Sequence, residues 1–241
     1  MLSKTHAKLF FKLKKRPSFW SSLLNANNDL LYKIYTHPFN QQLLIGTLPS
    51  PIFGHYLRDD YYYLQQFSLV LQTLSKRSLN VNDDLANHLT YLAKDIISNE
   101  HEMQRMYSSK HYSDTSQLKT GSVILAYSKY LRQSVNDTVL PVALSSALPC
   151  FWIYKELGAL QTDPVQLKEN PYKEWIATYS TPEFITATKL LIETVDILGK
   201  QASLEVQIKM QEAFKKGVTF ELEFLDEIWS HHIVKTQSLE A

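Results

Sequence analysis

LSSALPCFWIYKELG, residues 144–158, holds the only cysteine of the chain within a run of mostly apolar residues. Four residues of this run are spaced at i, i+3, i+4 and i+7 and so share one face of a helix: Cys150, Ile153, Tyr154 and Leu157. Pro149 cannot donate a backbone hydrogen bond and crowds the carbonyl of Ser145, so we expect a kink one residue before the thiol. The run therefore predicts a kinked helix with Cys150 and Tyr154 on one face and room beside the sulfur.

The helical pattern continues on both sides of this run. Only 6 Gly and 9 Pro interrupt the chain, and most long segments repeat apolar residues at three and four positions. Ser50 followed by Pro51 marks one helix start, because Ser can cap free amide groups and Pro is tolerated in the first turn. Further helices are predicted near residues 19–36, 83–108, 120–135, 141–160, 171–179, 182–200 and 203–232. We expect an all-α chain forming a single domain over residues 1–241, with 1–25 as an extension or a first helix.

Composition argues against several classes of protein. With 25 Lys and Arg against 24 Asp and Glu the net charge is +1, so no nucleic-acid partner is expected. One cysteine forms no internal disulfide and is too few for a thiolate metal site, which favours a cytoplasmic protein. No stretch reaches the roughly 18 apolar residues of a spanning helix, so no membrane partner is expected. The basic amphipathic start, MLSKTHAKLFFKLKKRPSFW, does not resemble a signal peptide; a membrane-surface or targeting role stays open beside a first helix or frayed end.

Carboxylates on apolar helix faces are candidate site residues, because burying a carboxylate is costly unless it is paired or hydrogen-bonded. Asp60 lies on the apolar face of its helix, whereas its neighbours Arg58 and Asp59 point elsewhere. Glu221 lies in the middle of the apolar face of the last helix, and Glu223 falls on a different, solvated face. Asp60 is either satisfied by a buried tyrosine or backbone amide, or it holds a ligand.

The inward tyrosines and the thiol each allow two interpretations. Tyr127 lies on the apolar face of its helix and is either plain core or a site residue whose hydroxyl finds a partner. Cys150 is either a small buried hydrophobe or a nucleophile. Together, two inward carboxylates, a thiol and several tyrosines on separate helices suit a pocket for a flat, nitrogen-rich ring.

At these residues the sequence resembles the TenA family, also called thiaminase II. The resemblance runs in order from about residue 30 to about residue 232. The motifs that carry it are HPF (37–39), GTLP (46–49), YLRDDYYYL (56–64), LAYSKYL (125–131), LPCFWIYKELG (148–158), NPYKEWIATYS (170–180) and a glutamate, Glu221, in the last helix. The block around the cysteine is the most specific of them.

The resemblance implies an all-helical, haem-oxygenase-like bundle that hydrolyses aminopyrimidines without a cofactor. Its expected substrate is 4-amino-5-aminomethyl-2-methylpyrimidine, which gives the hydroxymethylpyrimidine and ammonia in thiamin salvage, and thiamin is a second expected substrate. It implies Cys150 as nucleophile, Glu221 as general acid and base, and Asp60 as the group that holds the ring. It implies that Tyr63, Tyr154 and Tyr179 line or stack on the ring and that Tyr127, also a pocket tyrosine, hydrogen-bonds near the sulfur. It also implies a homotetramer.

The sequence departs from the family pattern at a few positions, and two other functions remain in view. Asp59 stands where the family usually has Gln, a tryptophan common ahead of HPF is absent, and Leu225 stands where a tryptophan is common. A metal-dependent oxidase on the same fold would use inward carboxylates and histidines. The candidates for that role are Glu100, His101, Glu102, Asp226, His231 and His232, although their spacing does not repeat the Glu-x-x-His pattern. The other alternative is a non-catalytic pyrimidine-binding or regulatory protein.

Overall fold

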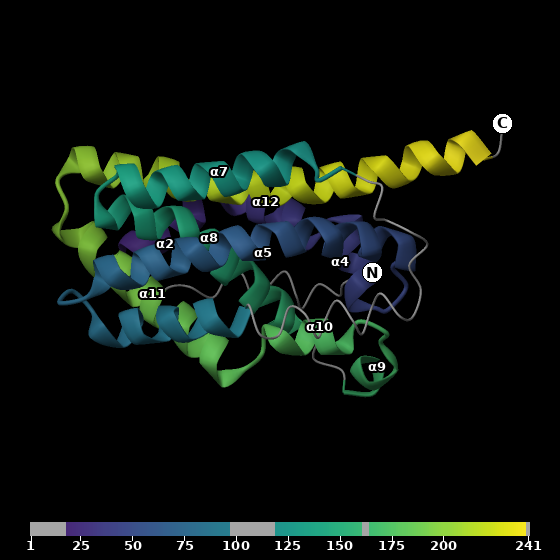
Figure 1. The fold of residues 1–241 in the computed structure, drawn as a ribbon, viewed down its shortest axis with the longest axis horizontal. Coiled ribbons are helices and arrows are strands. Elements are labelled where there is room, and N and C mark those ends of the chain that lie inside the picture. Colours follow the sequence, from purple (N-terminus) through teal and green to yellow (C-terminus); the bar gives the residue numbers. More distant parts are fainter. Residues whose placement is uncertain (1–17, 97–118, 161–163, 240–241) are drawn as a thin grey trace.

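The computed structural model describes residues 18–96, 119–160 and 164–239, with side chains described outside 164–166 and 232–239. Within these ranges all regular structure is helical, which confirms the predicted all-α class (Figure 1). The elements in chain order are α2 (Phe19–Ala26), α3 (Asn28–Tyr35), α4 (Pro38–Leu44), α5 (Ser50–Ser78), helical residues 83–96, α7 (Ser122–Asp137), α8 (Leu140–Leu160), α9 (Pro164–Glu169), α10 (Lys173–Thr178), α11 (Pro182–Gln201) and α12 (Leu204–Leu239).

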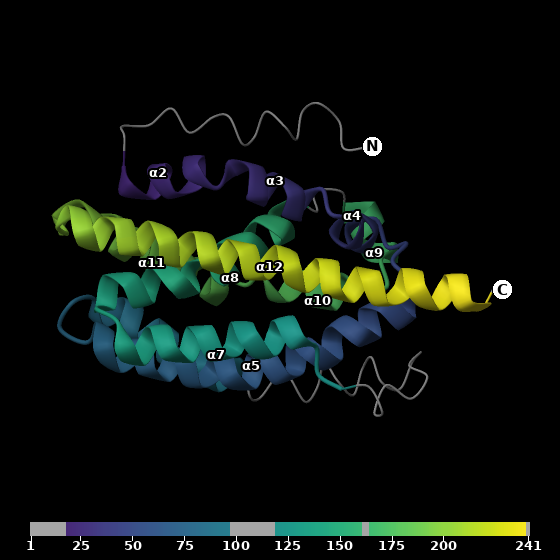
Figure 2. The same ribbon diagram turned by 90° about the horizontal axis from the view of Figure 1, so that it is seen from above.

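The helix α8 lies at the centre of the bundle. Most of its 21 residues are buried, and it packs against α12, α11, α7, α5 and α10. A helix that is apolar all round belongs in a core rather than at a surface. Figure 2 shows the long helix α12 running between α2 and α3 on one side and α5 and α7 on the other. The cysteine therefore sits on the helix that the rest of the bundle surrounds.

Most predicted helices are confirmed. The helices α7, α8, α10 and α11 begin and end within two residues of their predicted ranges, whereas α12 continues to Leu239, past its predicted end at residue 232. The helix predicted over 19–36 is wrong as one element, because α2 and α3 are separated at Asn27, whose side-chain amide donates to the Leu23 carbonyl at 2.8 Å. The helices α4 and α9 are additional. Of the helix predicted over 83–108, residues 97–108 lie outside the described part of the chain.

The helix α5 begins at Ser50 as predicted, but the predicted side-chain cap is wrong. The N-cap position is Pro49, and no side-chain hydrogen bond caps the helix there. Just before it, Gly46 adopts φ 77°, a left-handed conformation that glycine accepts without strain. The side-chain amide of Asn170 then donates to the carbonyls of Leu43 and Leu44 at 2.9 and 3.0 Å. These contacts join the chain before α5 to the segment that leads into α10.

A close approach of α12 to α8 brings two predicted site residues together. Gly217 faces the middle of α8, where an added Cβ would lie 2.7 Å from Pro149 Cγ and 2.9 Å from the Ser146 carbonyl oxygen. Cys150 directly follows Pro149, and Glu221 follows Gly217 by one helical turn. The α8 helix is continuous through Pro149, and the predicted kink there stays a prediction.

Candidate active site

A cavity of about 190 Å³ lies among α5, helical residues 83–96, α8, α10 and α11. An engineered cavity of about 150 Å³ in another protein holds one benzene ring, so this volume suits a single substituted ring. Its lining is mostly apolar and aromatic, and the charged residues among the described lining are both acidic. The residues that line it are Leu57, Asp60, Tyr63, Leu64, Phe67, Leu71, Leu92, Asp95, Ile96, Cys150, Phe151, Tyr154, Trp175, Thr178, Tyr179, Thr181 and Phe184.

The structure brings all seven predicted site residues to one region. Five of them line the cavity: Asp60, Tyr63, Cys150, Tyr154 and Tyr179. The other two, Tyr127 and Glu221, are buried behind the lining and bonded to each other, with the tyrosine hydroxyl donating to Glu221 Oε1 at 3.0 Å. The predicted inward orientation of Asp60, Glu221 and Tyr127 is confirmed, since all three are buried. Glu223 is exposed, also as predicted.

The pKa of the Glu221 carboxyl lies near 7 because two effects on it oppose each other. Burial raises the pKa of its carboxyl from 4.5 to about 7, while the hydroxyls of Tyr127 and Tyr154 favour the charged form and limit the rise. A group with this pKa is present in both protonation states near neutral pH. Glu221 can therefore both accept and donate a proton, which is what general acid and base catalysis requires.

The Cys150 thiol is buried and uncharged at rest. Burial raises the pKa of Cys150 well above its usual range, the nearby Glu221 and Asp60 charges raise it further, and the Tyr63 hydroxyl opposes the rise. That hydroxyl is close enough to act on the thiol, yet no hydrogen bond of good geometry joins them, and it has no partner among the described residues. A thiol in this environment needs a base before it can act as a nucleophile.

Tyrosines and other aromatic residues surround the carboxylates and the thiol. Tyr154 shares a hydrogen bond of 3.0 Å with Tyr56, and its ring lies 4.8 Å from that of Tyr179. Tyr63 stacks on Tyr127 with centroids 5.2 Å apart, which links α5 to α7. Aromatic faces at these separations pack firmly and restrict side-chain motion. These contacts join the cavity lining on α5 to α7 and the lining on α8 to the residue that follows α10.

Sequence reasoning assigned no role to three residues that either line the cavity or contact its lining. Tyr56 holds the hydroxyl of Tyr154, and it lies on the same apolar face of α5 as Asp60. Trp175 lines the cavity and its buried indole nitrogen has no hydrogen-bond partner among the described residues. Asp95 lies near the end of helical residues 83–96. Helical spacing could have found Tyr56, whereas nothing in the local sequence distinguishes the other two from core or surface positions.

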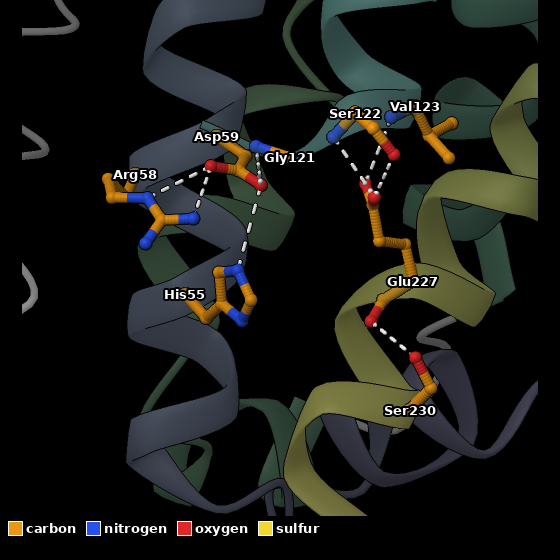
Figure 3. A network of polar contacts seen from close by, with 8 residues as sticks. All are labelled: His55, Arg58, Asp59, Gly121, Ser122, Val123, Glu227 and Ser230. Atoms are coloured by element: carbon orange, nitrogen blue, oxygen red, sulfur yellow. Dashed lines mark hydrogen bonds and ion pairs between the residues drawn. The ribbon is translucent and has the colours of Figure 1, made fainter. Parts of the chain in front are cut away.

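The prediction that Asp59 points away from the core is wrong. Its side chain is fully buried, with Oδ1 accepting from Arg58 Nε at 2.9 Å and from Arg58 Nη2 at 2.6 Å. Oδ2 accepts from the Gly121 backbone N–H at 3.2 Å (Figure 3). The reason is that α5 packs on both α7 and α8, so two faces of the helix are covered. A single apolar stripe describes only one of them.

The residues proposed for a metal-dependent oxidase do not gather in the described structure. Asp226 is 65% exposed and pairs with His37 at 3.3 Å, and His231 is exposed. The candidates Glu100, His101 and Glu102 lie outside the described residues, as does the side chain of His232. Within the described part of the chain no three His, Cys, Asp or Glu residues are grouped as metal ligands would be. None of the described helices is long and apolar enough to cross a membrane.

The fold and the cavity define the class of protein. The bundle matches a solved domain from Shewanella denitrificans described as having a heme oxygenase-like fold, with TM-score 0.64, 12% identity, and coverage of 90% of this chain and 94% of that one. The chain is thus a heme oxygenase-like helical bundle with a ring-sized cavity beside its central helix. Residues 25–231 match the TENA/THI-4/PQQC family, and the chain belongs to that family.

Two curated relatives are about 30% identical to this chain over the residues that align. It is 31% identical over 216 residues to the thiamine biosynthesis multifunctional protein ThiED of Corynebacterium glutamicum, an alignment covering 88% of this chain and 27% of that protein. It is 29% identical over 213 residues to an aminopyrimidine aminohydrolase of Bacillus subtilis, covering 83% and 87%. The chain therefore spans about a quarter of the first relative and most of the second.

A solved relative agrees with this assignment. The TenA homologue from P. horikoshii superposes with TM-score 0.74 and 25% identity, covering 89% of this chain and 99% of that chain. The match spans nearly the whole bundle, so the two proteins share the arrangement of their helices.

Proposed function

We propose that this protein is an aminopyrimidine aminohydrolase of thiamin salvage that converts 4-amino-5-aminomethyl-2-methylpyrimidine to its hydroxymethyl counterpart and ammonia. The observation that carries the proposal is the convergence of Cys150, Asp60 and three tyrosines on one ring-sized cavity, with Glu221 directly behind them. The name of the B. subtilis relative, whose length the chain largely covers, supports it.

The cavity suits this substrate in size and charge. A pyrimidine with three small substituents is one ring, and a cavity of about 190 Å³ is of that order. The aminomethyl group is a basic amine, and the acidic residues Asp60 and Asp95 favour a cation over an anion at the lining. Asp60 binds the amino group and a ring nitrogen of the pyrimidine. Tyr63, Tyr154 and Tyr179 contact the faces and edges of the ring.

Cys150 acts as the nucleophile in the first step. Its sulfur forms a bond to a ring carbon next to a ring nitrogen, and the electron pair of that C=N bond moves onto the nitrogen, which takes a proton. The thiol proton passes to the ionised form of Glu221, the buried base that acts electrostatically on Cys150, and Glu221 then delivers it to that ring nitrogen. This transfer explains how a thiol with a raised pKa can react.

Loss of the amino group and entry of water complete the reaction. The ring electrons form a double bond to the exocyclic methylene as its bond to nitrogen breaks, and the aminomethyl group, bound as the ammonium cation, leaves as neutral ammonia. Water adds to the methylene and gives a proton to Glu221. The sulfur–carbon bond then breaks, the ring nitrogen gives up its proton to the departing sulfur, and the ring regains its aromaticity. Glu221 gives its proton to the released ammonia, which leaves the enzyme in its starting state. One carboxyl with a pKa of about 7 thus serves both directions of proton transfer.

The rest of the proposal follows from the family resemblance. Thiamin is a second substrate, in which the thiazolium ring is the leaving group in place of ammonia. The reaction needs no metal or organic cofactor, the protein acts in the cytoplasm as a homotetramer of single-domain subunits, and nucleic acid and membrane are not partners. Tyr127 supports the reaction by bonding Glu221 rather than by lining the cavity.

The test is a comparison of two substrates on the purified protein. We expect hydroxymethylpyrimidine and ammonia from the aminomethylpyrimidine, and a lower kcat/KM for thiamin, whose second ring must be accommodated beyond the cavity described here. Turnover of neither compound, in a protein that binds the ring by calorimetry, would refute the hydrolase assignment and favour a binding protein. Iron or manganese retained by that inactive protein would favour the oxidase.

A further inference from the structure

Two carboxylates from different helices meet at the N-terminus of α7 (Figure 3). Glu227 of α12 accepts from the Ser122 and Val123 backbone N–H groups at 3.0 and 3.1 Å and from the Ser122 hydroxyl at 2.6 Å. Asp59 of α5 accepts from the Gly121 N–H at 3.2 Å. The first N–H groups of a helix have no partner within the helix, and the positive end of its dipole favours negative charge. The side chains of Glu227 and Asp59 supply both the hydrogen-bond acceptors and the negative charge.

Gly121 lets both carboxylates come this close. A Cβ added there would lie 2.5 Å from Glu227 Oε2 and 2.7 Å from Asp59 Oδ2, so any side chain would push them away. As the N-cap residue, Gly121 offers no side-chain cap of its own. The cap of α7 therefore comes from its two neighbouring helices, which ties all three together at one point.

We call the place where Asp59 and Glu227 meet the N-terminus of α7 the junction. Residues of α5 partly balance its negative charges. Arg58 binds Asp59 through two nitrogens, and His55 Nε2 lies 3.7 Å from Asp59 Oδ2. Burial raises the pKa of Asp59. The hydrogen bonds from Arg58 and the Gly121 N–H oppose this rise, and the nearby charge of Glu227 increases it. The junction therefore depends on residues that the catalytic scheme does not use.

The junction and the Tyr127–Glu221 hydrogen bond connect the same two helices. Glu227 follows Glu221 by six residues, about 9 Å along α12, and Tyr127 follows Val123 by four residues, about 6 Å along α7. The helices α7 and α12 run in opposite directions here. The Val123–Glu227 and Tyr127–Glu221 hydrogen bonds are therefore successive contacts along the same pair of helices. Fixing one contact fixes the register at the other. On α5, Asp59 also directly precedes the cavity residue Asp60.

We propose that Glu227, together with Asp59, is a positioning residue: it holds α7 in register with α12 so that the Tyr127 hydroxyl meets Glu221. Its effect on turnover rests on the proposed function, but its effect on the Tyr127–Glu221 contact does not. The groups that act on Glu221 are the hydroxyls of Tyr127 on α7 and Tyr154 on α8, with the Cys150 thiol close by. Of these groups, the junction positions the Tyr127 hydroxyl on α7.

The test compares Glu227→Ala with Glu227→Gln and with Glu223→Ala. The last is a matched control, because Glu223 is an exposed glutamate on the same helix, closer in sequence to Glu221. We expect Glu227→Ala to lower kcat by about tenfold to a hundredfold, as small misplacements of catalytic groups do, with KM changed by much less. Glu227→Gln should recover part of the loss, since its amide oxygen can still accept the two hydrogen bonds from Ser122, whereas its NH2 cannot accept from Val123. Glu223→Ala should match the wild type.

A second readout does not depend on turnover. Infrared titration of the Glu221 carboxyl, assigned with Glu221→Gln, should show a higher pKa in Glu227→Ala, because the bond from Tyr127 that favours the charged form is weakened. Should Glu227→Ala fail to fold, Ser122→Ala removes one of the three hydrogen bonds and should shift the titration in the same direction. Unchanged titration and kcat in a destabilised variant would overturn the proposal. A wild type without turnover would refute only the proposed function.

Discussion

The buried carboxyl of Glu221 should make the stability of the protein depend on pH in a specific way. In the unfolded chain this group titrates at 4.5, and in the folded protein at about 7. Between these two pH values the folded state binds one more proton than the unfolded state, so the free energy of unfolding falls as pH rises. At 1.36 kcal/mol per pH unit the total loss is about 3 kcal/mol, complete slightly above pH 7.

Chemical denaturation at fixed protein concentration measures this effect. Glu221→Gln removes the titrating group, so the difference in unfolding free energy between the variant and the wild type should grow by about 3 kcal/mol from pH 4.5 to pH 8. Using the difference cancels the other titrating groups. Glu223→Gln, at an exposed position two residues away, should show a constant difference. A constant difference for Glu221→Gln as well would refute the raised pKa and the dual acid and base role built on it.

Three further predictions concern the cavity and its supports. Cys150→Ala should lower kcat by about 10³-fold or more while leaving the dissociation constant of the hydroxymethylpyrimidine within about tenfold, measured by calorimetry; retained turnover would contradict the nucleophile. Tyr127→Phe removes a hydrogen bond to Glu221 of about 1.5–3 kcal/mol in its charged form, so the pH profile of kcat should move up by about 1–2 pH units; an unmoved profile would show that another group titrates. Gly217→Ala should cost about 1–3 kcal/mol of stability by thermal unfolding, because its Cβ would press on Pro149; wild-type stability would mean that α12 moves away freely.

Much of the fold follows from local spacing. The central helix α8 is predicted almost to its ends, because its apolar run is long and continues on both sides of its one internal interruption, Pro149. The break at Asn27 is not predicted, since the apolar spacing continues across it and the hydrogen bonds that end α2, from the Asn27 side chain to Leu23 and from its backbone N–H to Leu24, appear only in the structure. Short helices such as α4 depend on tertiary contacts more than on their own periodicity.

The candidate site is predictable where a polar residue interrupts an apolar face. Asp60, Tyr127 and Glu221 each do so, and all three are buried. Asp59 is missed, because its burial depends on a second face of α5 that packs against α7. The partners of Glu227 are likewise beyond sequence reasoning, since they lie about a hundred residues away and meet it only through the register of α7 and α12.

The central claim is that Cys150, set among carboxylates in a ring-sized cavity, hydrolyses the aminopyrimidine. The most direct measurement is incubation of the wild type, Cys150→Ala and Glu221→Gln with 4-amino-5-aminomethyl-2-methylpyrimidine in ¹⁸O-labelled water, with the product followed by mass spectrometry. We predict labelled hydroxymethylpyrimidine and ammonia from the wild type, and almost none from either variant although both still bind the ring. Equal product from Cys150→Ala, or none from a wild type that binds the substrate, would contradict the account.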